Sequence, residues 1–135
     1  VDDPAEALNA LAAVLRPGGL ASVLSANRAG ATITRVAAGR IGEARELLES
    51  ADGTLGAADP LRRRFSLAEL EALIRSAGLT PRSAHGVRIF ADAAPQQLLE
   101  LDQQALDDLI ALERAAAGDP AYLAVATSLH VLALR

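Results

Sequence analysis

The turn Arg16-Pro17-Gly18-Gly19 constrains the fold more than any other part of the sequence. Proline cannot continue a helix, and the glycines that follow it permit a sharp reversal of the chain. Before this turn, Asp3-Pro4 is a typical helix start, and the leucine spacing predicts an amphipathic helix that ends near Leu15. After the turn, Leu20–Ala26 is a short and almost entirely apolar run, as in a strand covered on both faces. A helix, a tight turn and a buried strand form half of a βαβ unit, so the sequence predicts an α/β fold.

The rest of the chain alternates helical and extended patterns. We expect helices over residues 31–50, 67–77 and 95–117, a helical turn over 122–127, and extended segments over 79–91 and 129–134. Ser66 and Glu69 have the spacing of a capping box, and Leu98 lies on the apolar face of the third of these helices. The sequence has no internal repeat and no domain boundary, so we expect residues 1–135 to belong to one domain.

Composition excludes several classes of function. The chain has no cysteine, which excludes a disulfide framework, a thiolate nucleophile and a cysteine-ligated zinc site. The net charge of −4 argues against a general electrostatic attraction to nucleic acid, although a local basic patch stays open. No apolar run approaches the length of a membrane span. We therefore expect a soluble, cytoplasmic protein with no membrane partner.

Two polar side chains are candidates for ligand binding. Asn27 follows the apolar run 20–26, and ligands of open α/β sheets bind at the carboxyl ends of strands. The alternative for Asn27 is a structural role in a turn. Arg88 lies in the predicted extended segment 79–91, where an arginine must reach solvent, pair with a carboxylate or face a ligand. Pairing and ligand binding both stay open for Arg88.

Other motifs carry weaker signals. Arg62-Arg63-Arg64 is a concentrated basic feature that could contact phosphate, perhaps of RNA, and its alternative is a solvated loop. His85 and His130 are far apart and lack metal-ligand spacing, so we predict no metal site and interpret them as structural. Asp107 and Asp108 fall on the polar face of a helix, where we expect solvent.

The first segment of the chain resembles a known family. The sequence VLRPGGL at residues 14–20, with the helix before it and the strand ending at Asn27, resembles the "vLrpGG" segment of class I S-adenosylmethionine-dependent methyltransferases. The sequence GVRIFAD at residues 86–92 resembles the "GVRvFhDy" stretch of the tRNA 5-carboxymethoxyuridine methyltransferases within that class. Residues 98–101, 109–113 and 119–122, and His130, also match these enzymes. Ala91 and Ala93 depart from the family, which has a histidine and a tyrosine there.

The resemblance implies the C-terminal half of a Rossmann-like methyltransferase fold. In that fold the strand order is 3-2-1-4-5-7-6, and this chain would supply strands five, six and seven with their flanking helices, the last strand being antiparallel. In this family a glycine-rich loop after the first strand and an acidic residue at the end of the second strand hold S-adenosylmethionine. Neither feature is found after or at the end of a predicted strand of this sequence. We therefore expect no cofactor-binding residue within the chain and a cofactor site that lies mostly upstream of Val1.

The resemblance also implies methyl transfer to an oxygen or carboxylate acceptor, with a tRNA wobble uridine as one candidate. Such a transfer depends on alignment of the reacting groups more than on acid–base residues. Asn27 and Arg88 would then orient the acceptor with support from Tyr122 and His130, and the arginine triplet would contact phosphate. Two alternatives stay open: a methyltransferase of small molecules, or a non-catalytic half that self-associates through an exposed sheet edge. We expect the fragment alone to be inactive.

Overall fold

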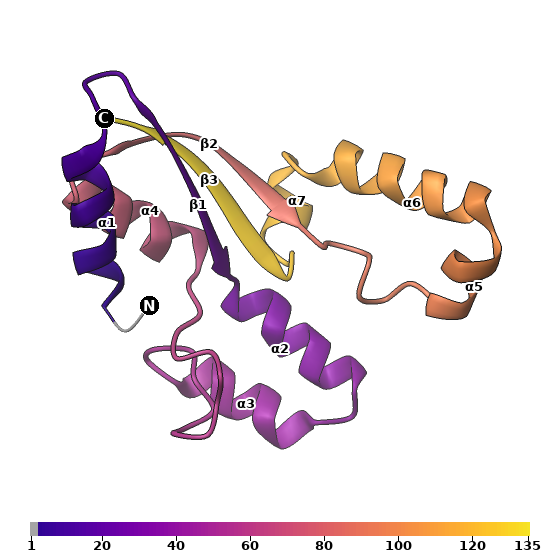
Figure 1. Cartoon of the computed structure of the whole chain (residues 1–135). Coiled ribbons are helices and arrows are strands. Elements are labelled where there is room, and N and C mark those ends of the chain that lie inside the picture. The colour runs from indigo at the N-terminus through magenta and orange to yellow at the C-terminus, as the bar shows by residue number, and fades with distance from the viewer. Residues whose placement is uncertain (1–2) are drawn as a thin grey trace.

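The computed structural model describes residues 3–135, apart from the side chains at positions 98 and 99. Helices and strands are mixed along the chain, as the α/β prediction requires (Figure 1). The elements are α1 (Pro4–Val14), β1 (Leu20–Ala26), α2 (Arg28–Ala37), α3 (Ile41–Glu49), α4 (Leu67–Ser76), β2 (Thr80–Val87), α5 (Gln96–Leu101), α6 (Gln103–Ala116), α7 (Pro120–Leu123) and β3 (Ser128–Leu134). The expectations for Val1 and for the side chain of Leu98 lie outside the described residues. None of the described helices is long and apolar enough to cross a membrane.

The three strands form an antiparallel sheet in the order β1-β3-β2 (Figure 1). β3 is the central strand and runs antiparallel to both neighbours, with Val23 opposite Val131 on one side and His85 opposite His130 on the other. β1 and β2 therefore run in the same direction. Their carboxyl ends and the start of β3 meet at one end of the sheet.

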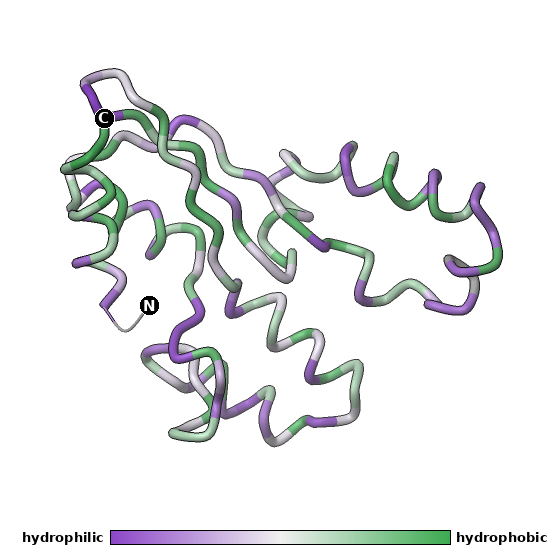
Figure 2. Tube along the Cα trace, viewed as in Figure 1, coloured by the Kyte–Doolittle hydropathy of each residue, from purple (hydrophilic) through white to green (hydrophobic). Residues whose placement is uncertain are grey.

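One face of the sheet packs against α1 and α4 to form the core. Val131 and Ala133 of β3 alternate with half-buried residues and are fully buried against this face. They meet Leu8 of α1 and Ile74 of α4 in a single apolar cluster. In Figure 2 the strands and the helices beside them carry mostly apolar residues, whereas the segment that leads into α4 is strongly hydrophilic. Burying an aliphatic side chain of this size contributes about 1.5–3 kcal/mol, so this cluster holds the helices on the sheet.

The other face and the outer edge of β1 are open. Leu20 and Leu24 are 56% and 65% exposed, so the prediction that β1 is covered on both faces is wrong for this chain. The amide N–H of Asn27 donates to the Thr127 carbonyl on β3 at 3.0 Å. Because backbone groups alternate sides along a strand, the odd-numbered residues of β1 face β3 and the even-numbered ones face the outer edge. Within residues 3–135 no strand pairs with that edge, apart from an isolated bridge to Phe65 at its far end.

Two predicted helices are each divided in the structure. The segment 95–117 forms α5 and α6 rather than one helix, because Asp102 caps a new start by accepting hydrogen bonds from the amides of Gln104 and Ala105. The segment 31–50 forms α2 and α3, separated at Gly39, whose φ of 74° ends the first helix. α2 already begins at Arg28, earlier than the apolar pattern predicts. The last short helix, α7, likewise begins at Pro120 rather than at Tyr122.

The extended segment predicted over residues 79–91 is too long. β2 ends at Val87, and Arg88 has a φ of 58°, a left-handed conformation that stops the strand. The residues from Arg88 to Ala91 therefore form bends and turns and not the end of a strand. From there the chain enters α5 and α6, which extend away from the sheet as an arm (Figure 1).

Candidate binding site at the carboxyl ends of β1 and β2

The loop between α7 and β3 joins the carboxyl ends of β1 and β2. The Asn27 amide donates to the Thr127 carbonyl at 3.0 Å, and the Thr127 amide donates to the Arg88 carbonyl at 3.2 Å. The structure thus brings Asn27 and Arg88 to the same end of the sheet, although they are far apart in the sequence. Tyr122 is close by on α7, where its ring meets the Phe90 ring edge-on at a centroid distance of 5.5 Å.

Asn27 has a structural role at this end. Its side chain is buried, and its Nδ2 donates to the carbonyls of Ala124 and Ala126 at 3.0 and 2.8 Å. Its Oδ1 accepts the amide of Ala29 at 3.2 Å and caps α2. Both polar atoms are therefore committed to the chain itself, which matches the turn alternative. This arrangement argues against a direct contact between Asn27 and a ligand.

Arg88 is paired and partly accessible. Its Nη2 donates to Asp92, whose other oxygen accepts the hydroxyl of Thr127 at 2.6 Å. The Arg88 side chain nevertheless remains 62% exposed. The carboxylate pairing left open by the sequence is thus present, and an exposed ion pair of this kind costs little to exchange for another anion.

Glu113 on α6 fixes the loop that carries Arg88 and was not identified from the sequence as a site residue. Its carboxylate accepts the backbone N–H groups of Ile89, Phe90 and Ala91 at 3.0, 2.8 and 2.9 Å. Successive amides that converge on one carboxylate form an anion-binding nest, here filled by the protein's own side chain. Since 22 to 24 residues separate the partners, no local pattern announces the contact. Beside it, Arg88, Leu109 and Glu113 line a hollow of about 470 Å³ under the arm.

The two histidines lie together on the open sheet face. Their rings stack at a centroid distance of 5.9 Å, and the Nε2 of His130 lies 2.8 Å from the hydroxyl of Ser22 on β1. His130 therefore belongs to a cross-strand polar row, two residues inside β3 from the loop at the strand ends. The structure does not place it beside Arg88 and Tyr122 in one group. Among the described residues, no cluster of three or more potential ligands could hold a metal ion.

The arginine triplet splits into buried and exposed members. The side chain of Arg64 is 3% exposed and pairs with the side chain of Asp59, which is 2% exposed, through two hydrogen bonds of 2.6 and 3.2 Å. The hydrogen bond from Arg64 outweighs burial and holds the pKa of the Asp59 carboxyl well below its usual range. This burial corrects the expectation of a phosphate contact for Arg64. Arg62 and Arg63 are exposed, and Arg63 pairs with Asp52 at 2.9 Å on the surface.

Arg28 ties the segment 51–64 to α4, a role for which the sequence has no signal. Its Nη2 donates to the carbonyl of Ala51 at 3.0 Å and to the carboxylate of Glu69 at 3.1 Å. Glu69 also completes the predicted capping box, because it accepts the amide of Ser66 while its own amide donates to the Ser66 hydroxyl. The Ser66 amide, with the Ser66 hydroxyl and Arg28, lowers the pKa of Glu69 against the effect of burial. Arg62 and Arg63 are thereby held next to the end of β1.

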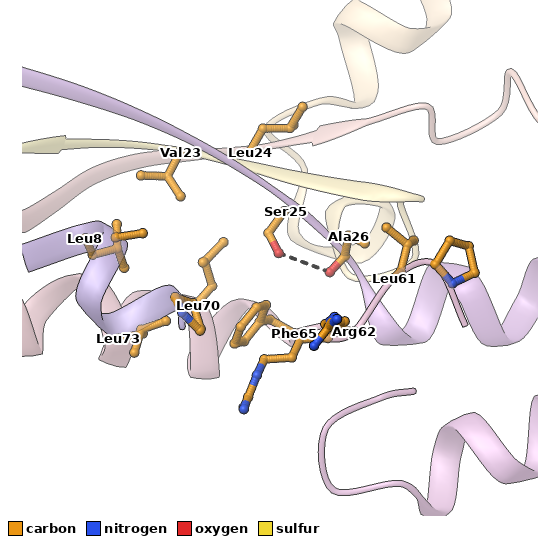
Figure 3. Close-up of a pocket in the computed structure, with 14 residues that line it drawn as sticks. Leu8, Val23, Leu24, Ser25, Ala26, Leu61, Arg62, Phe65, Leu70 and Leu73 are labelled. Atoms are coloured by element: carbon orange, nitrogen blue, oxygen red, sulfur yellow. Dashed lines mark hydrogen bonds between the residues drawn. The ribbon is translucent and has the colours of Figure 1, made fainter. Parts of the chain in front are cut away.

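A cavity of about 380 Å³ opens beside that end of β1 (Figure 3). Figure 3 shows Val23 and Ser25 pointing from β1 toward Leu8 and Leu70 on the helices, while Leu24 points to the opposite side. Phe65 and Leu73 complete the apolar wall, and Arg62 and Arg63 line the same cavity. The site therefore combines an apolar interior with exposed guanidinium groups.

The described residues at the carboxyl ends of β1 and β2 lack the groups that hold an adenosyl cofactor. Binding of an adenosyl group needs a glycine turn for close backbone approach and a free carboxylate for the ribose hydroxyls. β1 is followed by Asn27 and Arg28, and Arg88 follows β2. Asp92 is engaged by Arg88 and Thr127.

Comparisons with known proteins identify no family. A scan against protein-family models gives no match, and a search of curated proteins gives no significant match either.

Proposed function

We propose that this chain forms the part of a class I methyltransferase domain that contains strands five, six and seven. The observation that carries the proposal is the strand order β1-β3-β2, with β3 antiparallel to both neighbours. Read as strands five, seven and six, it is the order that the resemblance implies. The helix, the turn at 16–19 and the strand β1 add support, because α1 packs against the sheet as a helix before strand five would.

In this proposal the open edge of β1 receives strand four from another polypeptide segment. The even-numbered residues of β1 direct their backbone groups to that edge, and the strand carries no charged residue or proline that would oppose pairing. The segment that pairs there would also bring the cofactor-binding loop, because the described residues at the ends of β1 and β2 supply no glycine turn and no free carboxylate for it. The complete domain would transfer the methyl group of S-adenosylmethionine to an oxygen acceptor.

Arg88 is the residue that we propose for orienting the acceptor. It lies at the carboxyl end of β2 with an exposed guanidinium, and Glu113 fixes its loop from behind. A guanidinium can hold a carboxylate through two parallel hydrogen bonds, which suits an acidic acceptor. Tyr122 packs edge-on against Phe90 of this loop and would form an apolar wall beside the bound acceptor.

Reconstitution tests the proposal directly. The chain is mixed with a separately produced segment holding strands one to four of a tRNA 5-carboxymethoxyuridine methyltransferase, and methyl transfer from labelled S-adenosylmethionine to tRNA is measured. We expect transfer by the mixture and no cofactor binding by the chain alone in calorimetry. Micromolar binding of S-adenosylmethionine to the chain alone would contradict the assignment of the cofactor site to another segment.

The nature of the acceptor is tested through the exposed arginines. Replacing Arg62 and Arg63 with glutamine should lower transfer to tRNA and make it less sensitive to salt, because each lost phosphate contact reduces counterion release. Transfer to small carboxylic acids should not change. If tRNA methylation is equally unaffected, the alternative of a small-molecule methyltransferase is favoured.

Association without catalysis is the second candidate, and the open edge of β1 favours it. An uncharged strand with unpaired backbone groups can pair with a second copy of itself. In that case Leu24→Lys, at an exposed position of the edge strand, should convert a sedimenting dimer to a monomer. A wild-type chain that sediments as a monomer at high concentration would contradict this candidate.

A further inference from the structure

The cavity beside β1 has the features of a small-molecule site in its own right. Its volume of about 380 Å³ lies within the range of ligand pockets, about 300–1,000 Å³. Its walls come from three elements that the core already holds in place. Leu8 of α1 and Leu70 of α4 are buried members of the main apolar cluster, and Val23 of β1 packs against them. The core therefore holds most of the apolar interior in place, and residues 60–63 of the segment before α4 close one side of it.

The polar groups of the cavity gather at one side of it. Arg62 and Arg63 line it from the segment that precedes Phe65, and both are exposed. Arg64, the third arginine of the run, is turned inward onto Asp59 and holds this segment in place. Arg63 pairs with Asp52 while both side chains remain about half exposed. Such a pair contributes at most about 1 kcal/mol, so an incoming anion can exchange with Asp52.

Charge complementarity identifies the occupant. The chain carries a net charge of −4, so two adjacent exposed arginines at an apolar cavity are opposite in sign to the molecule as a whole. A wholly apolar ligand would bring no opposite charge to these guanidinium groups, and a wholly polar anion would make no apolar contact with the leucine and phenylalanine walls. A ligand with one anionic head and an unbranched apolar tail satisfies both parts.

We propose that this cavity binds an amphipathic monocarboxylate, with its carboxylate at Arg62 and Arg63 and its tail between β1, α1 and α4. The tail lies against Val23, Leu70 and Leu73, the apolar side chains that line the interior. Arg62 and Arg63 are also the residues proposed above to contact tRNA phosphate, but binding of a monocarboxylate by this chain needs neither tRNA nor S-adenosylmethionine and does not involve Arg88, so it can fail independently of methyl transfer.

Octanoate, 1-octanol and acetate separate the contributions of the head and the tail. Each is titrated into the chain at millimolar concentration, and binding is followed by the methyl NMR signals of Val23, Leu70 and Leu73. We expect octanoate to bind more tightly than octanol, and acetate not to shift these signals. Equal affinity for octanoate and octanol would overturn the proposal, as would shifts centred on Leu20 and Leu24 of the open face.

Matched variants test the two parts of the site. Arg62→Gln with Arg63→Gln should weaken octanoate binding about tenfold, the loss expected for about 1.4 kcal/mol of charge-assisted hydrogen bonding, and leave octanol unchanged. Arg45→Gln with Arg75→Gln is the control, because it removes the same charge and breaks exposed pairs with Glu49 and Glu71 elsewhere. Ala7→Phe, on α1 at the cavity, should fill it and abolish binding of both ligands while the protein stays folded. Equal weakening by the control pair, or undiminished binding in Ala7→Phe, would overturn the proposal.

Discussion

The carboxylate of Asp59 and the guanidinium of Arg64 form a buried ion pair joined at two points, with oxygen–nitrogen distances of 2.6 and 3.2 Å. Arg64 also donates to the carbonyl of Gly53 at 2.8 Å, and Asp59 accepts the amides of Leu55 and Leu61. The pair therefore organises the segment between α3 and α4 from within. Arg62 and Arg63 stay on the surface as a consequence.

Asp59→Asn should lower the free energy of unfolding by about 3 kcal/mol, because the substitution leaves the buried Arg64 without its counter-charge. Urea unfolding at neutral pH measures the loss. Asp52→Asn is the control, since its exposed pair with Arg63 should contribute less than about 1 kcal/mol. Equal losses in the two variants would contradict the burial of the Asp59–Arg64 pair.

The same pair predicts a pH dependence. The pKa of Asp59 is lower in the folded chain than the value of about 3.9 expected for an unfolded aspartate. The stabilisation from its ionised form is then fully present above about pH 4 and is lost as the pH falls toward the folded pKa. The difference in free energy of unfolding between wild type and Asp59→Asn should therefore shrink on acidification. A constant difference down to the acid limit of folding would contradict this sign.

Asn27→Ala tests the structural role of Asn27. The substitution removes the cap of α2 and leaves the carbonyls of Ala124 and Ala126 without their donor. We expect the free energy of unfolding to fall by about 2–3 kcal/mol, because the variant loses a helix cap and leaves buried carbonyl groups without a hydrogen bond. Asn9→Ala, at an exposed position of α1, should cost no more than about 0.5 kcal/mol. Thermal and urea unfolding of both variants measure the contrast, and a silent Asn27→Ala would restore Asn27 as a candidate ligand-binding residue.

Two glycines form a matched pair for testing the close approach of α2 to the loop before β3. A Cβ on Gly30 would lie 2.1 Å from the carbonyl oxygen of Ala126, whereas a Cβ on Gly42 of α3 would meet nothing within 4 Å. Gly30→Ala should therefore destabilise the chain by about 1–3 kcal/mol, as overpacking does. Gly42→Ala should be neutral or stabilise by about 0.5–1 kcal/mol, because alanine favours a helix. Comparable effects of the two substitutions on the unfolding midpoint would show that α2 and the loop are not in contact.

Glu113→Gln should loosen the loop after β2. The neutral amide accepts weaker hydrogen bonds from Ile89, Phe90 and Ala91 than a carboxylate does, so we expect a loss of about 1–2 kcal/mol. Hydrogen exchange at these amides should accelerate more than exchange in β3. Glu100→Gln, on the exposed surface of α5, provides the control. Unchanged exchange at Phe90 in Glu113→Gln would contradict the nest.

Local patterns predicted local structure well. Asp3 caps α1 through the amides of Ala5 and Glu6, and Ser66 and Glu69 form the capping box that their spacing indicates. The start and end of β1 also agree with the apolar run. These features depend on residues within a few positions of each other, where composition and spacing carry the information.

Contacts between distant residues were not predictable in the same way. The carbonyls that accept the Asn27 side-chain amide are 97 and 99 positions away. Glu113 lies on α6 and accepts amides of the loop that follows β2. Arg64 shows a different limit: three consecutive arginines look alike in sequence, and only the fold decides that Asp59 buries one of them. Tertiary packing therefore determined which candidate residues remain accessible, and it removed Asn27 and Arg64 from the candidate binding site.

Amide hydrogen exchange along β1 tests the central claim most directly. In the chain alone, the amides of Leu20, Ser22 and Leu24 should exchange rapidly, while those of Ala21, Val23 and Ser25, which face β3, stay protected. Adding the segment with strands one to four of a class I methyltransferase should then protect the even-numbered amides. The claim is contradicted if the even-numbered amides of the chain alone are as protected as the odd-numbered ones, or if they stay unprotected when a folded, cofactor-binding partner segment is present.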